Sequence, residues 1–261
     1  MTAPETSAED AGPGGGAEAD FGYRRVKASE KAELVRGVFD SVASRYDVMN
    51  DLMSGGIHRL WKAALIERLH PRPQETFLDV AGGTGDIARR ILARSGPTGR
   101  VILCDINERM LGHGRNRAID ANMPSGIDYV AGDAELLPIA SRSVDACTIA
   151  FGLRNVTRID AALREARRVL RPGGRFFCLE FSHVAPAFLA RGYDLYSFSV
   201  LPALGQIVAR DARSYQYLVE SIRRFPPQEA LASMLREAGF EQVRWRDFTF
   251  GVAALHSGWR L

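Results

Sequence analysis

Residues 77–86 read Phe-Leu-Asp-Val-Ala-Gly-Gly-Thr-Gly-Asp, an apolar run that ends in a glycine-rich turn. The apolar run is typical of a buried strand, and residues 87–93 are typical of a helix. Glycine adopts positive φ in tight turns and leaves no Cβ between a ligand and the backbone. The N–H groups that begin the next helix would point at that ligand. The stretch therefore predicts a nucleotide-like cofactor at Gly83, Thr84 and Gly85.

Two classes of cofactor fit this turn. Residues 83–88 match the dinucleotide pattern G-x-G-x-x-A, and Asp105 lies 20 residues after the last of these glycines. Asp79, however, precedes the glycines, where a carboxylate repels a pyrophosphate and attracts the sulfonium and ammonium of S-adenosylmethionine. Asp105 ends a second apolar run and can accept bonds from both ribose hydroxyls, and Asp133-Ala134 follows a third run near the expected adenine. These acids favour a methyltransferase; a dinucleotide oxidoreductase is the alternative.

The composition is that of a globular protein, with 46% hydrophobic and 25% charged residues. No run of about 18 apolar residues occurs, so we expect no membrane-spanning helix. Residues 1–22 contain five acids and no Lys or Arg, and they predict a disordered acidic leader. They lack the features of a secretion signal or a transit peptide, which favours a bacterial cytoplasmic location. The cysteines and histidines show no ligand spacing, so we expect core cysteines and no metal.

The charge is distributed unevenly along the chain. The leader carries −5 and the whole chain +3, which leaves +8 on the rest. Part of this excess lies in Arg164, Arg167, Arg168, Arg171 and Arg175. Either a solvated helix face or attraction to an anionic membrane, worth roughly 1 kcal/mol per well-placed cation, explains such a run. No nucleic-acid-binding module is recognisable, so we expect no nucleic-acid partner.

Short apolar runs alternate with helical stretches from residue 76 onward. The pattern predicts strands at 76–81, 100–105, 127–131, 143–150 and 174–181, and helices at 85–95, 107–121, 159–170 and 226–240. Such alternation indicates a parallel sheet with helices on both faces, and ligands bind beyond the carboxyl ends of its strands. Residues 241–250 and 252–259 predict a terminal antiparallel pair, which completes a seven-stranded α/β sheet.

Two segments fall outside this plan. Residues 23–70 predict an N-terminal helical lid over the domain formed by residues 71–261. Residues 186–218 are rich in aromatic and aliphatic side chains and predict an inserted helical segment. These side chains either line an apolar substrate channel or simply pack the helices onto the sheet.

Three stretches carry a more specific resemblance. They are residues 44–62 (SRYDVMNDLMSGGIHRLWK), residues 78–86 (LDVAGGTGD), and residues 151–156 (FGLRNV) continuing to 168–174 (RVLRPGG). Through them the chain, from about Phe21 to Leu261, resembles the ubiquinone/menaquinone biosynthesis C-methyltransferase family. The resemblance implies a class I methyltransferase fold with a Rossmann-like sheet. It also implies methyl transfer from S-adenosylmethionine to a ring carbon of a polyprenyl hydroquinone: 2-methoxy-6-polyprenyl-1,4-benzoquinol, demethylmenaquinol or both.

The resemblance also implies cofactor contacts. The family's binding positions fall on Thr84, Asp105, Asp133 and Ala134 in this chain. A serine that often contacts the cofactor in the family is replaced here by Ala150, which offers no hydroxyl.

Methylation of a ring carbon is easier when a neighbouring hydroxyl is ionised, but a phenol has a pKa of about 10. A fixed cation near the ring would favour the phenolate. We therefore expect Arg154 to stabilise the phenolate and Asn155 to orient it, with Tyr46 completing the polar contacts. A buried ion pair with an acid of the helix that follows is the alternative for Arg154. His58 would be either a base or a tie between lid and core.

A prenyl tail keeps such a substrate in the bilayer, so we expect peripheral contact with the inner membrane. A methyltransferase of a soluble phenol would share the cofactor site without an apolar channel, and a non-catalytic scaffold would have lost the site. The resemblance leaves open self-association and membership of a quinone-synthesis complex. The ring type and the tail length are not specified by the sequence.

Overall fold

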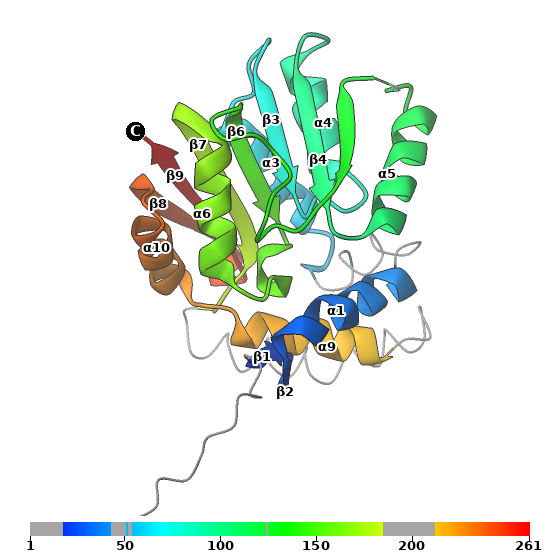
Figure 1. Cartoon of the computed structure of the whole chain (residues 1–261), viewed down its shortest axis with the longest axis vertical. Helices are drawn as coiled ribbons and strands as arrows, with labels where there is room; N and C mark the ends of the chain where they lie inside the picture. Colours follow the sequence, from blue (N-terminus) through cyan, green and yellow to red (C-terminus); the bar gives the residue numbers. More distant parts are fainter. Residues whose placement is uncertain (1–17, 43–50, 52–53, 124, 185–211) are drawn as a thin grey trace, which may run out of the picture.

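The computed structural model describes residues 18–42, 51, 54–123, 125–184 and 212–261. Its centre is a seven-stranded sheet in the order β5-β4-β3-β6-β7-β9-β8 (Figure 1). Its strands are β3 (Thr76–Val80), β4 (Arg100–Asp105), β5 (Ile127–Ala131), β6 (Val144–Ala150), β7 (Leu170–Phe181), β8 (Glu241–Phe248) and β9 (Ala253–Arg260). The first five strands are parallel, and β9 pairs antiparallel with β7 and β8. The predicted sheet, including its terminal hairpin, is confirmed.

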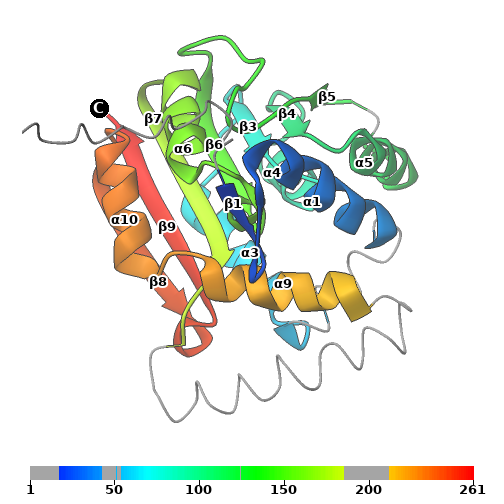
Figure 2. The ribbon, with the colours of Figure 1, turned by 60° about the horizontal axis from the view of Figure 1, so that its bottom comes forward.

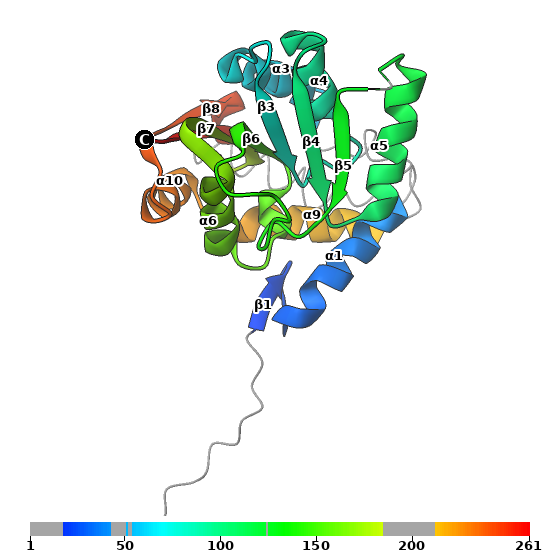
Figure 3. The same cartoon turned by 45° about the horizontal axis from the view of Figure 1, so that its top comes forward.

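Helices cover both faces of this sheet (Figure 3). They are α1 (Ala28–Val42), α3 (His58–Leu69), α4 (Asp86–Ser95), α5 (Glu108–Asp120), α6 (Ile159–Val169), α9 (Ala212–Arg224) and α10 (Gln228–Glu237), with short 3-10 turns η2 (Leu153–Asn155) and η4 (Thr249–Gly251). One core cluster joins α3, α4 and α9 to one face, and a second joins α6 and α10 to the other. Neighbouring strand residues such as Phe77 and Leu78 enter different clusters, which explains the continuous apolar runs.

The apolar stripe of α6 shows how sequence spacing sets this packing. Ala162, Leu163, Ala166 and Val169 recur at helical spacing and are all buried against the sheet. The strand after this helix begins at residue 170, four residues before the predicted start, because Leu170 already pairs with Val144 ahead of a bulge. The predicted core cysteines are confirmed: all three are buried and free.

The predicted leader is wrong in its last residues. Strands β1 (Glu18–Phe21) and β2 (Arg24–Lys27) form a hairpin, so the 1–22 leader and the start of the 23–70 helical lid both run into ordered β structure. The hairpin is held because Phe21 stacks on Tyr217 of α9, with ring centroids 4.3 Å apart. Residues 1–17 lie outside the described part of the chain.

Two elements cover the carboxyl end of the parallel strands. Helices α1 and α9 lie side by side there, with β1 against them (Figure 2). Of the predicted insertion at 186–218, residues 186–211 lie outside the described part, and the remainder begins α9. Tyr215 and Tyr217 of that helix are buried in the core cluster, as expected if they pack the helix onto the sheet. No described helix has the length and apolarity that a bilayer crossing requires.

Candidate active site

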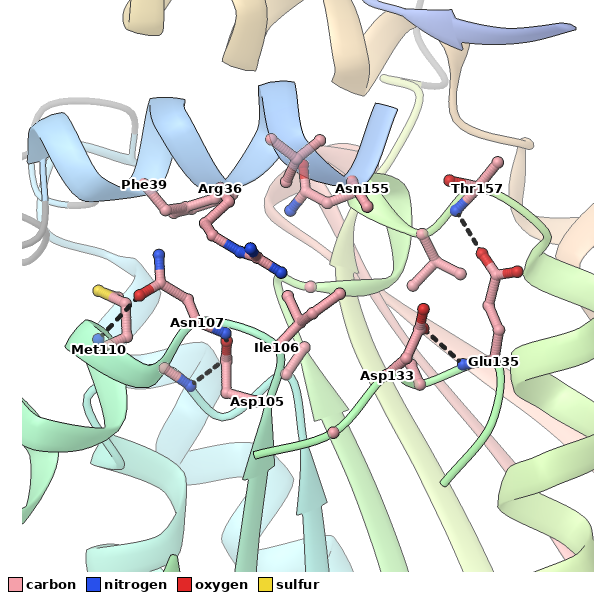
Figure 4. A pocket seen from close by; sticks show the side chains of 18 of the residues that line it. Arg36, Phe39, Asp105, Ile106, Asn107, Met110, Asp133, Glu135, Asn155 and Thr157 are labelled. Carbon is pink, nitrogen blue, oxygen red and sulfur yellow. Dashed lines mark hydrogen bonds between the residues drawn. The ribbon is translucent and has the colours of Figure 1, made fainter. Parts of the chain in front are cut away.

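A cavity lies between α1 and the loops that follow β3, β4, β5 and β6 (Figure 4). Helix α1 is fastened above it at both ends. Lys31 Nζ donates to the Val156 carbonyl at 3.0 Å, and Asp40 accepts from the Asn107 amide at 2.9 Å. Asn107 is also the N-cap of α5, since its side chain accepts from Met110 N–H. The helix that was expected as part of a lid therefore forms one wall of the cavity.

Asp105 joins the ends of two strands at the floor of the cavity. Its Oδ2 accepts from Gly83 N–H and its Oδ1 from Asn107 N–H, both at 2.8 Å. Burial raises the pKa of this carboxyl, while the two backbone donors lower it. A carboxylate offers about four acceptor positions, so two remain for the hydroxyls of a ribose. This geometry fits the contact that the sequence predicted for Asp105.

Asp133 lies on the opposite side of the cavity (Figure 4), and its neighbour Ala134 is also a lining residue. Asp133 Oδ1 accepts from Glu135 N–H at 2.9 Å, which leaves Oδ2 for a ligand. Glu135 in turn accepts from Thr157 N–H at 2.9 Å and so ties this loop to the loop after β6. Asp105 and Asp133 therefore lie on opposite sides of one cavity, as an adenosine-binding site requires.

The glycine-rich turn is only partly exposed to the cavity. Gly83 lines it, with φ +55°, whereas Thr84 and Gly85 are not among its lining residues. Thr84 is buried, and its hydroxyl accepts from Arg117 at 3.2 Å. An added Cβ at Gly114 of α5 would lie 3.1 Å from the Thr84 backbone, so the helix packs directly behind the turn. The Thr84 side chain therefore points away from the cavity, and the cofactor contact predicted at Thr84 stays a prediction.

Asp79 lies beneath the turn and does not line the cavity. Its Oδ1 accepts from Thr148 Oγ1 at 2.8 Å, while Oδ2 has no hydrogen-bond partner among the described residues. A Cβ at Gly82 would approach that oxygen to 2.7 Å, so the turn covers it closely. Burial raises the pKa of Asp79 to about 7. Asp79 thus supports the turn from below and lies behind the residues that line the cavity.

Arg154 and Glu180 form a buried ion pair behind the cavity wall. Arg154 Nη1 donates to Glu180 Oε1 and to the Phe151 carbonyl, both at 2.6 Å, and the two side chains are 0% and 2% exposed. Burial raises the pKa of Glu180, whereas the positive charge of Arg154 lowers it. Arg154 is absent from the described residues that line the cavity, so the structure matches the ion-pair alternative, with an acid on β7, not on the following helix, as the partner. Direct contact between Arg154 and a substrate stays a prediction.

The other predicted polar residues separate in space. Asn155 lines the cavity, and its Oδ1 accepts from the Tyr217 hydroxyl at 3.1 Å. His58 is buried at the start of α3, 2.8 Å from Asp51, and burial lowers its pKa. Its hydrogen-bond partners Asp51 and Ser54 both lie within the predicted lid, so His58 braces the lid itself, and its role as a base stays a prediction. Tyr46 lies outside the described residues.

Two residues of the site were not predicted from the sequence. Arg36 points from α1 into the cavity, beside Phe39, and is the only cation among the described residues that line it (Figure 4). Tyr217 holds Asn155 from a helix 62 residues further along the chain. An arginine on a helix and a tyrosine in an apolar helix face give no sequence signal for such roles, because both depend on how helices cross the end of the sheet. No group of three metal-ligating side chains occurs in the described ranges.

Solved structures share this fold. A SAM-dependent methyltransferase from Thermotoga maritima matches with a TM-score of 0.61 and 19% identity, over 86% of this chain and 99% of that one. The (4+2) cyclase SpnF matches with a TM-score of 0.66 and 17% identity, over 87% and 95%. The fold is therefore that of the class I methyltransferases. Because one of these proteins is a cyclase, the fold by itself leaves the reaction open.

The family follows from the sequence comparisons. The model of the ubiE/COQ5 methyltransferase family matches residues 25–260. The ubiquinone/menaquinone biosynthesis C-methyltransferase UbiE of Paracoccus denitrificans is 59% identical over 94% of this chain and 97% of that protein. The chain belongs to the ubiE/COQ5 methyltransferase family and is an S-adenosylmethionine-dependent C-methyltransferase. The resemblance recognised in residues 44–62, 78–86 and 151–174 is confirmed, and the oxidoreductase alternative is excluded.

Asp79 should make stability depend on pH. Its folded pKa, about 7, lies above its ordinary value of 3.8, so the folded state binds the proton more tightly. The free energy of unfolding should therefore fall as pH rises from about 4 to about 7, by on the order of 4 kcal/mol from this group. Asp79→Asn should flatten that slope in urea unfolding without cofactor. An unchanged slope in the variant would contradict the assignment.

Removing one partner of the buried ion pair should be costly. Arg154→Met leaves Glu180 buried without its cation, which should lower the free energy of unfolding by about 3–5 kcal/mol. The double variant with Glu180→Met should recover much of this loss. Arg164→Ala, which breaks an exposed pair with Asp160, is the control and should cost no more than about 1 kcal/mol. Equal losses in Arg154→Met and the control, measured by urea unfolding, would exclude a structural ion pair.

Proposed function

We propose that this enzyme methylates a ring carbon of a polyprenyl hydroquinone in ubiquinone or menaquinone biosynthesis. The observation that carries the proposal is a cavity with a cofactor floor at Asp105 and an apolar side, in a chain 59% identical to a quinone-biosynthesis methyltransferase. Val35, Phe39, Phe151 and Val156 supply the apolar lining, which suits an aromatic ring.

The described residues fit S-adenosylmethionine. Asp105 has two acceptor positions left for the ribose diol, and Asp133 has a free oxygen for the adenine amino group. Gly83 lets the methionine part approach the backbone. Arg36 supplies the positive charge that the cofactor's carboxylate needs. All other described charged residues that line the cavity are acids. When bound, the cofactor supplies the activated methyl group.

The substrate would meet Asn155 on the far side of the cavity. The side chain of Asn155 can donate to a ring oxygen and so fix the ring relative to the cofactor. Positioning of this kind can supply on the order of 7–11 kcal/mol of a barrier. Arg154 lies next to Asn155 in the chain, but Glu180 neutralises its charge. Arg154 therefore adds to the proposed site mainly by fixing η2, the turn that carries Asn155.

A prenylated substrate also requires contact with a bilayer, and we place this contact at the cavity end of the sheet. Of the arginines predicted to attract a membrane, Arg164, Arg168, Arg171 and Arg175 are each paired with an acid, and Arg167 donates to the Gly239 carbonyl. Leu60 and Phe250, in contrast, are 70% and 68% exposed. The Trp61–Thr249 hydrogen bond joins their two segments at the end where β7 finishes. We propose peripheral contact there with the inner membrane of a bacterium.

Methyl transfer from labelled S-adenosylmethionine tests the proposed reaction. The acceptors are a short-chain 2-methoxy-6-prenyl-benzoquinol, a short-chain demethylmenaquinol and an unprenylated phenol. We expect the label on the ring of at least one prenylated quinol and a much lower rate on the phenol. Preference for the unprenylated phenol would replace the proposal by a soluble-phenol methyltransferase.

Arg36 should bind the carboxylate of the cofactor. A lost charge-assisted hydrogen bond weakens binding by about tenfold or more. Arg36→Ala should therefore weaken binding of S-adenosylhomocysteine by that factor and leave 5′-methylthioadenosine, which lacks the carboxylate, unchanged in calorimetric titration. Arg109→Ala, a neighbouring exposed cation outside the cavity, is the control. Equal weakening of both ligands would show that Arg36 does not bind the carboxylate.

Phe250 should contribute to membrane binding. Phe250→Ser and Leu60→Ser each remove an exposed apolar side chain from the cavity end, and co-sedimentation with vesicles of bacterial lipid should fall several-fold. Ile119→Ser is the control, because Ile119 is 54% exposed near the far end of α5. If the control loses as much binding as Phe250→Ser, the contact is not at the cavity end.

A further inference from the structure

Tyr217 connects the active-site cavity to the N-terminal hairpin. Its hydroxyl lies 3.1 Å from Asn155 Oδ1, and this is the only hydrogen bond of that hydroxyl in the described structure. The residue is buried, and its ring stacks on Phe21 of β1 with an interplanar angle of 20°. Helix α9, β1 and the turn η2 therefore meet at the Tyr217 side chain.

The hydrogen bond determines how Asn155 presents its amide. Asn155 ends η2, whose backbone is fixed by the bond from Asn155 N–H to the Gly152 carbonyl at 3.1 Å. The backbone leaves the amide free to rotate about its last torsion, so the orientation must come from a side-chain partner. When Tyr217 donates to Oδ1, the amide nitrogen is left to donate elsewhere, and Asn155 projects into the cavity (Figure 4).

The phenol of Tyr217 is suited to act as a lasting donor. Burial raises its pKa, and the nearby Arg154 and Glu180 act in opposite directions. The hydroxyl therefore keeps its proton throughout the neutral range. An ionised oxygen would instead accept from the amide and turn its nitrogen away from the cavity.

The other side of Tyr217 is fixed by the hairpin. Besides the Phe21 stack, Tyr23 N–H donates to Glu220 Oε2 at 3.0 Å, one turn further along α9. A Cβ at Gly22 would collide with the Glu220 side chain, so the hairpin turn lies directly against the helix. The hairpin thus limits the movement of the tyrosine ring.

We propose that Tyr217 is a positioning residue for the methyl transfer: its hydroxyl orients the Asn155 amide toward a ring oxygen of the substrate, and Phe21 holds the tyrosine in place. This inference rests on the proposed role of Asn155. It gives the N-terminal hairpin a part in turnover, although no residue of the hairpin lines the cavity.

Tyr217→Phe tests the inference because it removes one oxygen and keeps the ring stack. We expect turnover of the quinol to fall about tenfold, which corresponds to about 1.4 kcal/mol. The dissociation constant of S-adenosylhomocysteine and the melting temperature should stay unchanged. Tyr129→Phe, which removes the same oxygen from a tyrosine of β5 that does not line the cavity, is the control and should match the wild type. Phe21→Leu should give a smaller loss of turnover than Tyr217→Phe.

The decisive arm is a double-mutant cycle with Asn155→Ala, measured as single turnovers of labelled cofactor. If Tyr217 acts through Asn155, Tyr217→Phe should have no further effect once Asn155 is alanine. The same loss in both backgrounds, or no loss in Tyr217→Phe alone, would overturn the inference. Wild-type turnover in Asn155→Ala would instead show that Asn155 has no role in the proposed site, and the inference would fail with it. Cofactor binding and the choice among acceptors would not be affected by that result.

Discussion

The carboxylate of Asp105 is the constraint on which the site depends. It accepts from Gly83 and Asn107, and so links the turn after β3 to the start of α5. The side chain of Asn107 in turn donates to Asp40 and so fixes the position of α1. The floor and one wall of the cavity are thereby positioned by a short chain of hydrogen bonds. The same carboxylate keeps two acceptor positions open, so in the proposed site one residue would serve both structure and ribose binding.

Buried acids accumulate at this end of the sheet. Asp79, Asp105 and Glu180 each follow the apolar part of a strand, and burial raises the pKa of all three. The cost of burying each carboxyl is offset by a different partner. Asp79 accepts from a threonine hydroxyl, Asp105 accepts from backbone amides, and Glu180 pairs with an arginine. Where Asp79 and Asp105 are ionised, their negative potential suits a cofactor that carries a sulfonium and an ammonium. Because Glu180 is neutralised by Arg154, this potential is concentrated on the cofactor side of the cavity.

Much of the fold could be predicted from the sequence, because strands and capped helices are specified by local patterns. Residues 100–105 and 127–131 form strands with the predicted bounds. The acids at strand ends could also be predicted, since parallel strands bring their carboxyl ends to one edge. The Arg154–Glu180 pair, the inward-facing Arg36 and the Tyr217–Asn155 bond could not, because they join segments far apart in the chain. Thr84 shows the limit of a motif, which fixes the turn but not the direction of its side chain.

The quinone pool of a strain that lacks the gene would show directly whether this enzyme methylates a quinone ring. Mass spectrometry should show demethylated quinone accumulating in that strain. Restoring the wild-type gene should clear it, and the masses would name the ring and the tail. A gene carrying Asp105→Ala should fail to clear it despite normal protein levels. A quinone pool that is unchanged by loss of the gene would contradict the account.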